Sequence, residues 1–354
     1  MRVCIKRATS SFRPVLQALL IFVAANAAGV RAQDPSARPA VPVDPIVAIV
    51  DAFRSHSLVG LGEPHRNEQA HRLRVALIRD ERFASVANDI VVEFGDARYQ
   101  DVIDRFISGG QVADNALRQV WQNTTQGHTV WDAPIYEAFF RAVREVNASR
   151  PRRSQLRVLL GDPPTDWDNV RGWDDVARPM ADYARDRYPA DLVRREVLAK
   201  GRRALIIYGD GHLWRHVGFP TLVSLLEQSA GTKLFTIGSA NLADLGAVQP
   251  TAASWPAPRI AVVRDTVLGL KEFSHYFPVP PGNDELRSLR LQDQMDAIAY
   301  YGPRNTLTTS ELSPALCGDP AYMKMRLGRM LWVPPGAPNL GEQLKQYCAR
   351  IAPK

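Results

Sequence analysis

Two patterns of hydrophobic and polar residues alternate along the chain. Short apolar and β-branched runs predict buried strands at 58–62, 89–94, 156–160, 204–208, 233–237, 259–263 and 295–301. Stretches with apolar residues three and four positions apart predict helices between them, including 46–54, 133–147 and one that runs from Glu63 to about residue 82. Strands that alternate with helices are typical of a mainly parallel β-sheet with helices on both faces. We therefore predict a single α/β domain over residues 46–354.

Titratable side chains stand where four of these strands end. They are Glu63 and His65 after the first strand, Glu93 at the end of the second, Asp162 after the third, and Asp210 and His212 after the fourth. Each could be a helix cap or a turn residue when taken alone. Because the carboxyl ends of parallel strands meet at one edge of the sheet, all six could lie close together. The sequence thus predicts a site at this edge.

Two kinds of chemistry suit such a set of side chains. Glu63, His65, Glu93 and His212 could activate water to hydrolyse an ester or an amide, because one group takes a proton from water while the others orient it and stabilise developing charge. The same four could instead bind Zn²⁺, Mn²⁺ or Fe²⁺, although the H-E-x-x-H helix signature is absent. Covalent catalysis has little support, since there is no G-x-S-x-G motif. The residues leave open whether a metal is needed.

Four further residues are candidates for binding a small-molecule or peptide substrate. Arg66 and Arg215 flank the two histidine turns and could bind a carboxylate or an oxyanion, unless they are ordinary surface arginines. Asp162 and Asp210 are expected to support the catalytic groups from the same edge.

An aromatic and polar loop at 121–132 is a candidate substrate-facing loop. The alternative is a capping loop in which Asp132 is the N-cap of the helix at 133–147. Trp131 and Tyr136 could shape the pocket or simply belong to the core.

Charge and hydropathy place the N-terminus apart from the rest of the chain. The net charge is +7, but Arg2, Lys6, Arg7, Arg13 and Arg31 precede residue 33 and no acidic residue does; removing these five leaves +2. The remaining chain is nearly neutral, which argues against nucleic-acid binding. A basic start, an apolar stretch and V-R-A before Gln33 predict a cleaved signal peptide at 1–32, rather than a membrane anchor. A proline-rich leader at 33–45, extended and poorly ordered, should follow.

The signal predicts an exported protein, periplasmic or extracellular, without a stable membrane span. Cleavage would remove Cys4 and leave Cys317 and Cys348. An even pair in an exported chain favours one disulfide that ties the C-terminal tail to the body, the alternative being two free thiols.

Four motifs together resemble a known group of proteins. They are G-L-G-E-P-H-R-N-E, I-V-V-E, L-L-G-D-P-P and I-I-Y-G-D-G-H-L-W-R, and they resemble the erythromycin-esterase-like and ChaN-like proteins that are grouped with the Tiki/TraB proteins. Those chains carry a G-E-x-H or G-E-x-x-H turn after the first strand, a Glu that ends the second, and a late strand followed by a His-bearing turn. The resemblance runs from about residue 57 to 215 and, through M-D-A-I-A-Y-Y-G, to about 302.

The resemblance implies that Glu63, His65, Glu93 and His212 line the site. In the esterase-like branch it implies a His with nearby Glu residues that activates water to open a macrolide lactone without a metal. In the Tiki branch it implies a metal-dependent peptidase, and in ChaN-like lipoproteins a haem. The G-E-P-H turn is one residue shorter than the esterase pattern, and no lipobox is present. Haem or metal binding without catalysis is therefore the alternative to hydrolysis.

Overall fold

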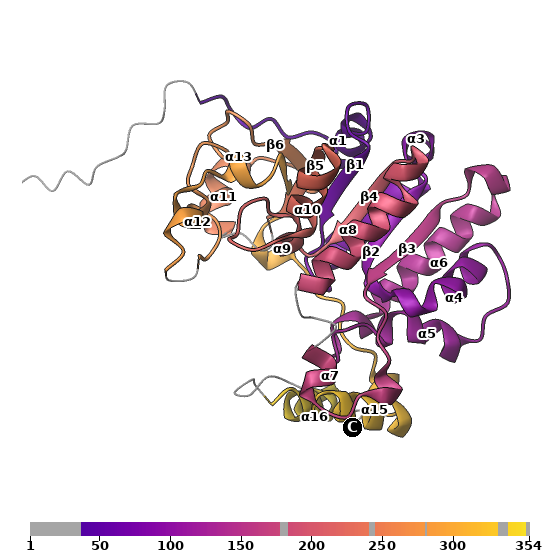
Figure 1. Cartoon of the computed structure of the whole chain (residues 1–354). Helices are drawn as coiled ribbons and strands as arrows, with labels where there is room; N and C mark the ends of the chain where they lie inside the picture. Colours follow the sequence, from indigo (N-terminus) through magenta and orange to yellow (C-terminus); the bar gives the residue numbers. More distant parts are fainter. Residues whose placement is uncertain (1–36, 178–182, 241–244, 280–281, 332–338, 352–354) are drawn as a thin grey trace, which may run out of the picture. The chain divides into compact units, whose positions relative to one another are not determined.

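Seven strands form one sheet in the order β3-β2-β4-β1-β5-β7-β6 (Figure 1). The computed structural model describes residues 37–177, 183–240, 245–279, 282–331 and 339–351. The strands are β1 (Leu58–Gly62), β2 (Asp89–Asp96), β3 (Arg157–Asp162), β4 (Ala204–Tyr208), β5 (Leu234–Ser239), β6 (Arg259–Val262) and β7 (Ala297–Tyr300). All neighbouring pairs are parallel except β6 and β7. The predicted α/β class is confirmed, with each strand end within two residues of its predicted position.

Helices cover both faces of the sheet because its strands are apolar on both sides. Val59 and Leu61 of β1 pack into one cluster, and Leu58 packs into another on the opposite face. The first cluster includes residues of α1 (Pro45–Ala52), α2 (Glu68–Arg79), α3 (Glu81–Val86), α4 (Gln100–Ile107), α5 (Asp114–Gln122) and α6 (Pro134–Ala148). The second is covered by α8 (Ala184–Glu196) and α10 (Leu222–Ala230), seen in front of the sheet in Figure 1. Both faces are therefore buried, as a parallel sheet requires.

A third apolar cluster lies around β6 and β7. It includes residues of α11 (Leu245–Ala252), α12 (Asp284–Ser288) and α13 (Leu291–Gln294). The described part of the predicted leader, 37–44, attaches here: the backbone N–H of Arg38 donates to the carbonyl of Asp265 at 3.0 Å, and Val43 exchanges two bonds with Ile260. These backbone bonds hold residues 38–43 against the third cluster.

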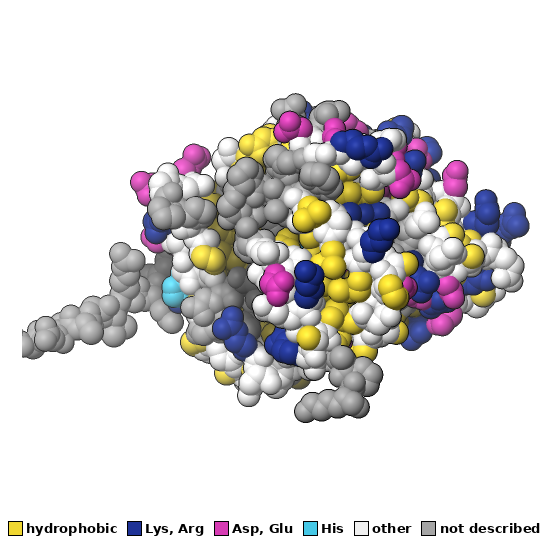
Figure 2. All heavy atoms as spheres, turned by 90° about the horizontal axis from the view of Figure 1, so that it is seen from below, with side chains coloured by type: hydrophobic (Ala, Val, Ile, Leu, Met, Phe, Trp, Pro, Cys, Tyr) yellow, Lys and Arg dark blue, Asp and Glu magenta, His cyan; other side chains and the backbone are white. Residues whose placement is uncertain are grey.

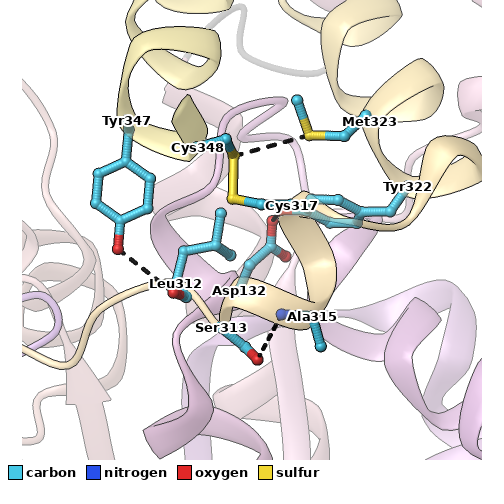
Figure 3. Close-up of a disulfide and its surroundings, with 9 residues drawn as sticks. All are labelled: Asp132, Leu312, Ser313, Ala315, Cys317, Tyr322, Met323, Tyr347 and Cys348. Carbon is cyan, nitrogen blue, oxygen red and sulfur yellow. Dashed lines mark hydrogen bonds between the residues drawn. A yellow bond between two sulfur atoms is a disulfide. The ribbon is translucent and has the colours of Figure 1, made fainter. Parts of the chain in front are cut away.

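The C-terminal helices build a small apolar cluster of their own. These helices are α14 (Pro314–Cys317), α15 (Pro320–Arg329) and α16 (Leu340–Ile351), and the cluster centres on Leu312, Tyr322, Met330, Leu344 and Cys348. The structure joins Cys317 to Cys348 by a disulfide with a Cα–Cα distance of 5.4 Å (Figure 3). The bridge links α14 to α16 rather than to the sheet. A further short helix, α7 (Trp173–Ala177), precedes α8.

Reducing this disulfide is expected to destabilise the C-terminal helices. The bond closes a loop of 31 residues, and the lost chain entropy corresponds to about 3–4 kcal/mol of unfolding free energy. Urea denaturation with and without dithiothreitol measures the difference. The Cys317→Ser/Cys348→Ser variant is the control, because its unfolding should not respond to the reductant. Equal midpoints for the oxidised and reduced wild type would contradict the prediction.

The predicted signal peptide, 1–32, lies outside the described residues. Within the described ranges, every helix is too short or too polar to cross a membrane. On the face shown in Figure 2, basic and acidic side chains are mixed with hydrophobic ones. That mixture agrees with the near-neutral charge of the chain after residue 32.

Candidate active site

A cavity of about 450 Å³ lies at the C-terminal edge of the neighbouring strands β2, β4 and β1. Its titratable lining residues are Glu63, His65, Glu93, Arg185, Asp210 and His212. The structure therefore brings the four predicted catalytic residues together. The volume is in the range of small-molecule sites, about 300–1,000 Å³.

Gly209 shows how closely three of these side chains approach one another. A Cβ atom at this position would lie 3.2 Å from Glu93 Oε2, 3.2 Å from His65 Cε1 and 3.8 Å from His212 Cδ2. Glycine follows β4 here, and its lack of a side chain leaves room for the three groups.

The turn after β1 presents His65 to the cavity. Its Nδ1 lies 2.5 Å from Glu63 Oε2, and its ring meets Trp131 edge-on with 4.7 Å between centroids. The other carboxylate oxygen of Glu63 accepts a bond of 2.9 Å from the buried Arg74. The His65 side chain is 40% exposed, and its Nε2 makes no hydrogen bond to a described residue. Neutral His65 that donates from Nδ1 to Glu63 can therefore accept a proton at Nε2.

Charge coupling sets the protonation of this pair. Burial raises the pKa of Glu63, but the charges of Arg74 and His65 outweigh burial and bring it below its ordinary value. Burial lowers the pKa of His65, but the hydrogen bond and charge of Glu63 raise it above its ordinary value. Glu63 is thus an anion, and His65 is a stronger base than free imidazole.

Glu93, three residues before the end of β2, is surrounded by hydrogen-bond donors. Its Oε2 accepts the backbone N–H of Gly209 at 2.7 Å, and its Oε1 pairs with Arg185 and lies 3.5 Å from His212 Nε2. Burial raises the pKa of Glu93, but the charges of His212 and Arg185 bring it well below its usual range. Glu93 is therefore an anion that holds two cationic side chains at the cavity.

His212, on the short helix α9 (Asp210–Leu213), lies between two carboxylates. Its Nδ1 is 2.7 Å from Asp186 Oδ1, and the same oxygen accepts the N–H of Leu222. Burial lowers the pKa of His212, but Glu93 and Asp186 raise it to about 9. Near pH 7 this imidazole is therefore a cation.

The two predicted supporting aspartates are buried beside these groups. Asp162 accepts bonds from the N–H and hydroxyl of Thr125 at 2.6 and 2.7 Å, and burial raises its pKa to about 6. Asp210 accepts the N–H of Ser239 and packs against Gly62, where a Cβ would lie 2.4 Å from its Oδ1. Burial raises the pKa of Asp210 to about 7. Asp210 lines the cavity. Asp162 is not among the described lining residues, and its Oδ1 lies 3.7 Å from Arg185 Nε.

The two arginines predicted to bind substrate are engaged elsewhere. The guanidinium of Arg66 donates to the carbonyl of Ser310 at 2.9 Å and to Glu311 at 2.7 Å. That of Arg215 pairs with Asp296 at 2.7 Å and with Glu227 at 3.2 Å. Neither is among the described residues that line the cavity with His65, so the geometry does not support a substrate-binding role for them there. Arg66 is next to His65 and Arg215 is close to His212 in sequence, but neither guanidinium points to the site. Carboxylates elsewhere bind both of them.

Several residues of the site escaped prediction. Arg74 falls on the apolar stripe of α2, between Ala70 and Leu77, and a charge at that position could have drawn notice as a buried partner. Arg185 and Asp186 begin α8, and no local pattern marks them. Leu307 and Thr309 reach the cavity from the segment after β7, far along the chain.

A divalent cation does not fit the four predicted ligands. The carboxylates of Glu63 and Glu93 already accept bonds from Arg74 and Arg185, and the raised pKa of His212 keeps its ring protonated. In the described part of the chain, no group of three or more His, Cys, Asp or Glu side chains is arranged to hold a metal ion. The expected metal site is therefore not supported.

One feature of the site, the His65 imidazole, suits haem. The His65 side chain is 40% exposed, and a histidine nitrogen is a usual axial ligand for haem iron. The rest of the lining is mainly polar or charged, with Pro64 and Leu307 as its large apolar side chains. Such walls suit a small polar ligand better than the apolar faces of a macrocycle.

Several proteins of solved structure are similar to this chain. A succinoglycan biosynthesis protein of known crystal structure has a TM-score of 0.53 and 11% identity, covering 77% of this chain and 96% of that one. A Bacillus cereus protein has a TM-score of 0.49 and 10% identity over 75% and 92%. ChaN of Campylobacter jejuni, described with cofacial haem binding, has a TM-score of 0.39 and 13% identity over 73% and 91%. Comparison with curated proteins gives no match.

Residues 49–151 match the family described as haem-binding uptake, Tiki superfamily, ChaN. This segment holds β1, β2, the Glu63–His65 turn and Glu93. The likeness to the erythromycin-esterase-like proteins stays a prediction. The resemblance to the ChaN-like proteins is therefore confirmed over residues 49–151.

Proposed function

We propose that this protein is a hydrolase in which His65 activates water to attack an ester or amide of a small molecule or peptide. The observation that carries the proposal is the 2.5 Å pair of His65 Nδ1 and Glu63. The Nε2 atom of His65 makes no hydrogen bond to a described residue, and the cavity also holds the cations Arg185 and His212. One histidine is a base and the other is a charged electrophile. A base that can take a proton and fixed cations in one pocket are what acid–base hydrolysis requires.

The reaction follows from these charges. His65 Nε2 takes a proton from water as the water oxygen bonds to the carbonyl carbon, and Glu63 stabilises the imidazolium that forms. His212 and Arg185 stabilise the negative charge on the carbonyl oxygen. The imidazolium of His65 then gives its proton to the leaving oxygen or nitrogen as the carbon–heteroatom bond breaks, and the neutral base returns.

The pH dependence of hydrolysis tests this assignment. His65 must be neutral to act as the base, and Glu63 raises its pKa above the ordinary 6.5. The value of kcat/KM should therefore increase with pH, with a midpoint above pH 6.5. His212 must be charged, so kcat/KM should fall again near its pKa of about 9. Titration of the acid released from esters and lactones, with assay of the amine released from amides, measures both limbs from about pH 5 to about pH 10. Activity that is flat across this range, or highest below about pH 6, would contradict the roles given to the two histidines.

Haem binding is the second candidate, because the family match includes the turn that carries His65. Titration with hemin discriminates the two. A Soret band that shifts on binding and is lost in His65→Ala, in a protein that hydrolyses none of the substrates tested, would favour haem.

We infer that the protein is exported and meets its substrate outside the cytoplasm. The signal-like pattern of residues 1–32 and the Cys317–Cys348 disulfide both fit an oxidising compartment, the periplasm or the extracellular space.

A further inference from the structure

The catalytic turn contains a backbone conformation that needs support. Arg66, directly after His65, has a φ of 64°, in the left-handed region that side chains other than glycine rarely adopt. Such a conformation persists where surrounding contacts fix it. The contacts that hold Arg66 therefore also fix the direction in which the turn presents His65.

Tyr136 joins the two ends of this turn. Its hydroxyl accepts the backbone N–H of Arg66 at 2.9 Å and lies 3.3 Å from Glu63 Oε1, to which it can donate. The ring is fully buried on α6 and packs against Phe94 and Trp131 with 5.0 Å between centroids in each case. Burial raises the pKa of Tyr136 well above its ordinary value, so the hydroxyl keeps its proton.

The segment after β7 holds the same turn from the other side. The N–H of Ser310 donates to the carbonyl of Arg66 at 2.7 Å, and the Arg66 guanidinium returns a bond to the Ser310 carbonyl. These contacts fix Arg66 itself, but among the described residues only the Tyr136 hydroxyl bonds both Glu63 and the Arg66 backbone. Tyr136 is thus the contact that couples the carboxylate to the turn.

We propose that Tyr136 is a positioning residue: its hydroxyl closes the Glu63–Arg66 turn and so keeps His65 Nδ1 on Glu63 and Nε2 toward the substrate. This rests on the proposed function for its effect on catalysis, but the geometry it describes can be measured without substrate. A purely structural tyrosine would contribute to stability and leave the titration of His65 unchanged.

The test replaces Tyr136 with Phe, which removes the hydroxyl and keeps the ring. Without the hydroxyl the Glu63–Arg66 turn is no longer closed, and the bond between His65 Nδ1 and Glu63 should weaken. Because Glu63 raises the pKa of His65, the NMR titration midpoint of His65 should then move to lower pH. With an ester that the wild type hydrolyses, kcat should fall about 10- to 100-fold while KM changes little. Tyr276→Phe is the matched control, because that buried hydroxyl bonds only the Leu268 carbonyl among described residues, in another cluster; it should affect neither quantity.

A folded Tyr136→Phe protein with a wild-type His65 titration would overturn the proposal, whether or not the wild type hydrolyses anything. Arg66→Gly gives a second test if Tyr136→Phe does not fold. Glycine accepts the positive φ and keeps the N–H that Tyr136 binds, while the guanidinium bonds to Ser310 and Glu311 are lost. An unchanged His65 titration in Arg66→Gly supports Tyr136, and a displaced one assigns the positioning to the arginine side chain instead.

Discussion

Replacing His65 with Ala is expected to lower kcat/KM for ester hydrolysis by about 10²–10⁴-fold, the usual contribution of a general base. The loss should be mainly in kcat, because Arg185 and His212 remain at the cavity to bind the carbonyl group. The His65 side chain is 40% exposed, so its removal should leave the fold intact. Initial rates at several substrate concentrations, with circular dichroism for the fold, measure both effects.

His56→Ala is the matched control, since His56 precedes the strand that His65 follows and lies at the opposite end of β1. It should retain wild-type kcat/KM. Glu63→Gln extends the test, because a neutral amide no longer raises the pKa of His65 and the acid limb of the pH profile should move to lower pH. Wild-type turnover in His65→Ala would remove this histidine from the mechanism, and the site would then need another base.

The strand positions and the site edge could be predicted because they depend on local sequence. Each parallel strand is a short apolar run buried on both faces, and this pattern is strong even without tertiary information. Glu63 directly follows such a run, Glu93 lies near the end of another, and His212 stands in the turn after a third. The shared direction of parallel strands then brings them together. The fold and the four central residues could be predicted for this reason.

The partners of these residues depend on contacts that a local pattern does not encode. Arg185 reaches Glu93 from a helix 92 positions away, and Tyr136 reaches Glu63 across 73 positions. Arg66 shows the converse failure: it stands next to His65, yet its guanidinium binds Ser310 and Glu311, 244 and 245 positions further on. Long-range pairing decides which charges face the cavity, and one sequence without homologues does not reveal it.

Asp132 is a second residue whose partner is distant in sequence rather than local. The sequence allowed a helix N-cap, but α6 begins after Ala133 without a side-chain cap. The carboxylate of Asp132 is instead fully buried and binds Arg326 of α15, with Nη2–Oδ1 and Nε–Oδ2 distances of 2.5 and 2.7 Å. The hydroxyl of Tyr322 donates to the same carboxylate. Figure 3 shows Tyr322 and Asp132 beside the disulfide.

Arg326→Met should therefore be the most destabilising single substitution proposed for this chain, lowering the unfolding free energy by about 3–5 kcal/mol. Methionine fills part of the space, but it leaves the buried carboxylate of Asp132 without its cation, and the carbonyl of Gln122 also loses a donor. The double variant Asp132→Asn/Arg326→Met removes the uncompensated charge and should recover part of the loss. Urea denaturation of the wild type, both single variants and the double variant gives the coupling energy.

Arg141→Met is the control, because Arg141 is 46% exposed in its pair with Glu137 on α6 and should change stability by less than about 1 kcal/mol. Both pairs contain an arginine and a carboxylate, and they differ chiefly in their access to water.

If Arg326→Met cost no more unfolding free energy than Arg141→Met, water would have to reach Asp132 in the folded protein. If the double variant were as unstable as Arg326→Met, lost packing rather than an unpaired charge would be the cause. A large loss that the double variant partly restores would show that this ion pair attaches the C-terminal helices to the loop that carries Trp131, the aromatic neighbour of His65.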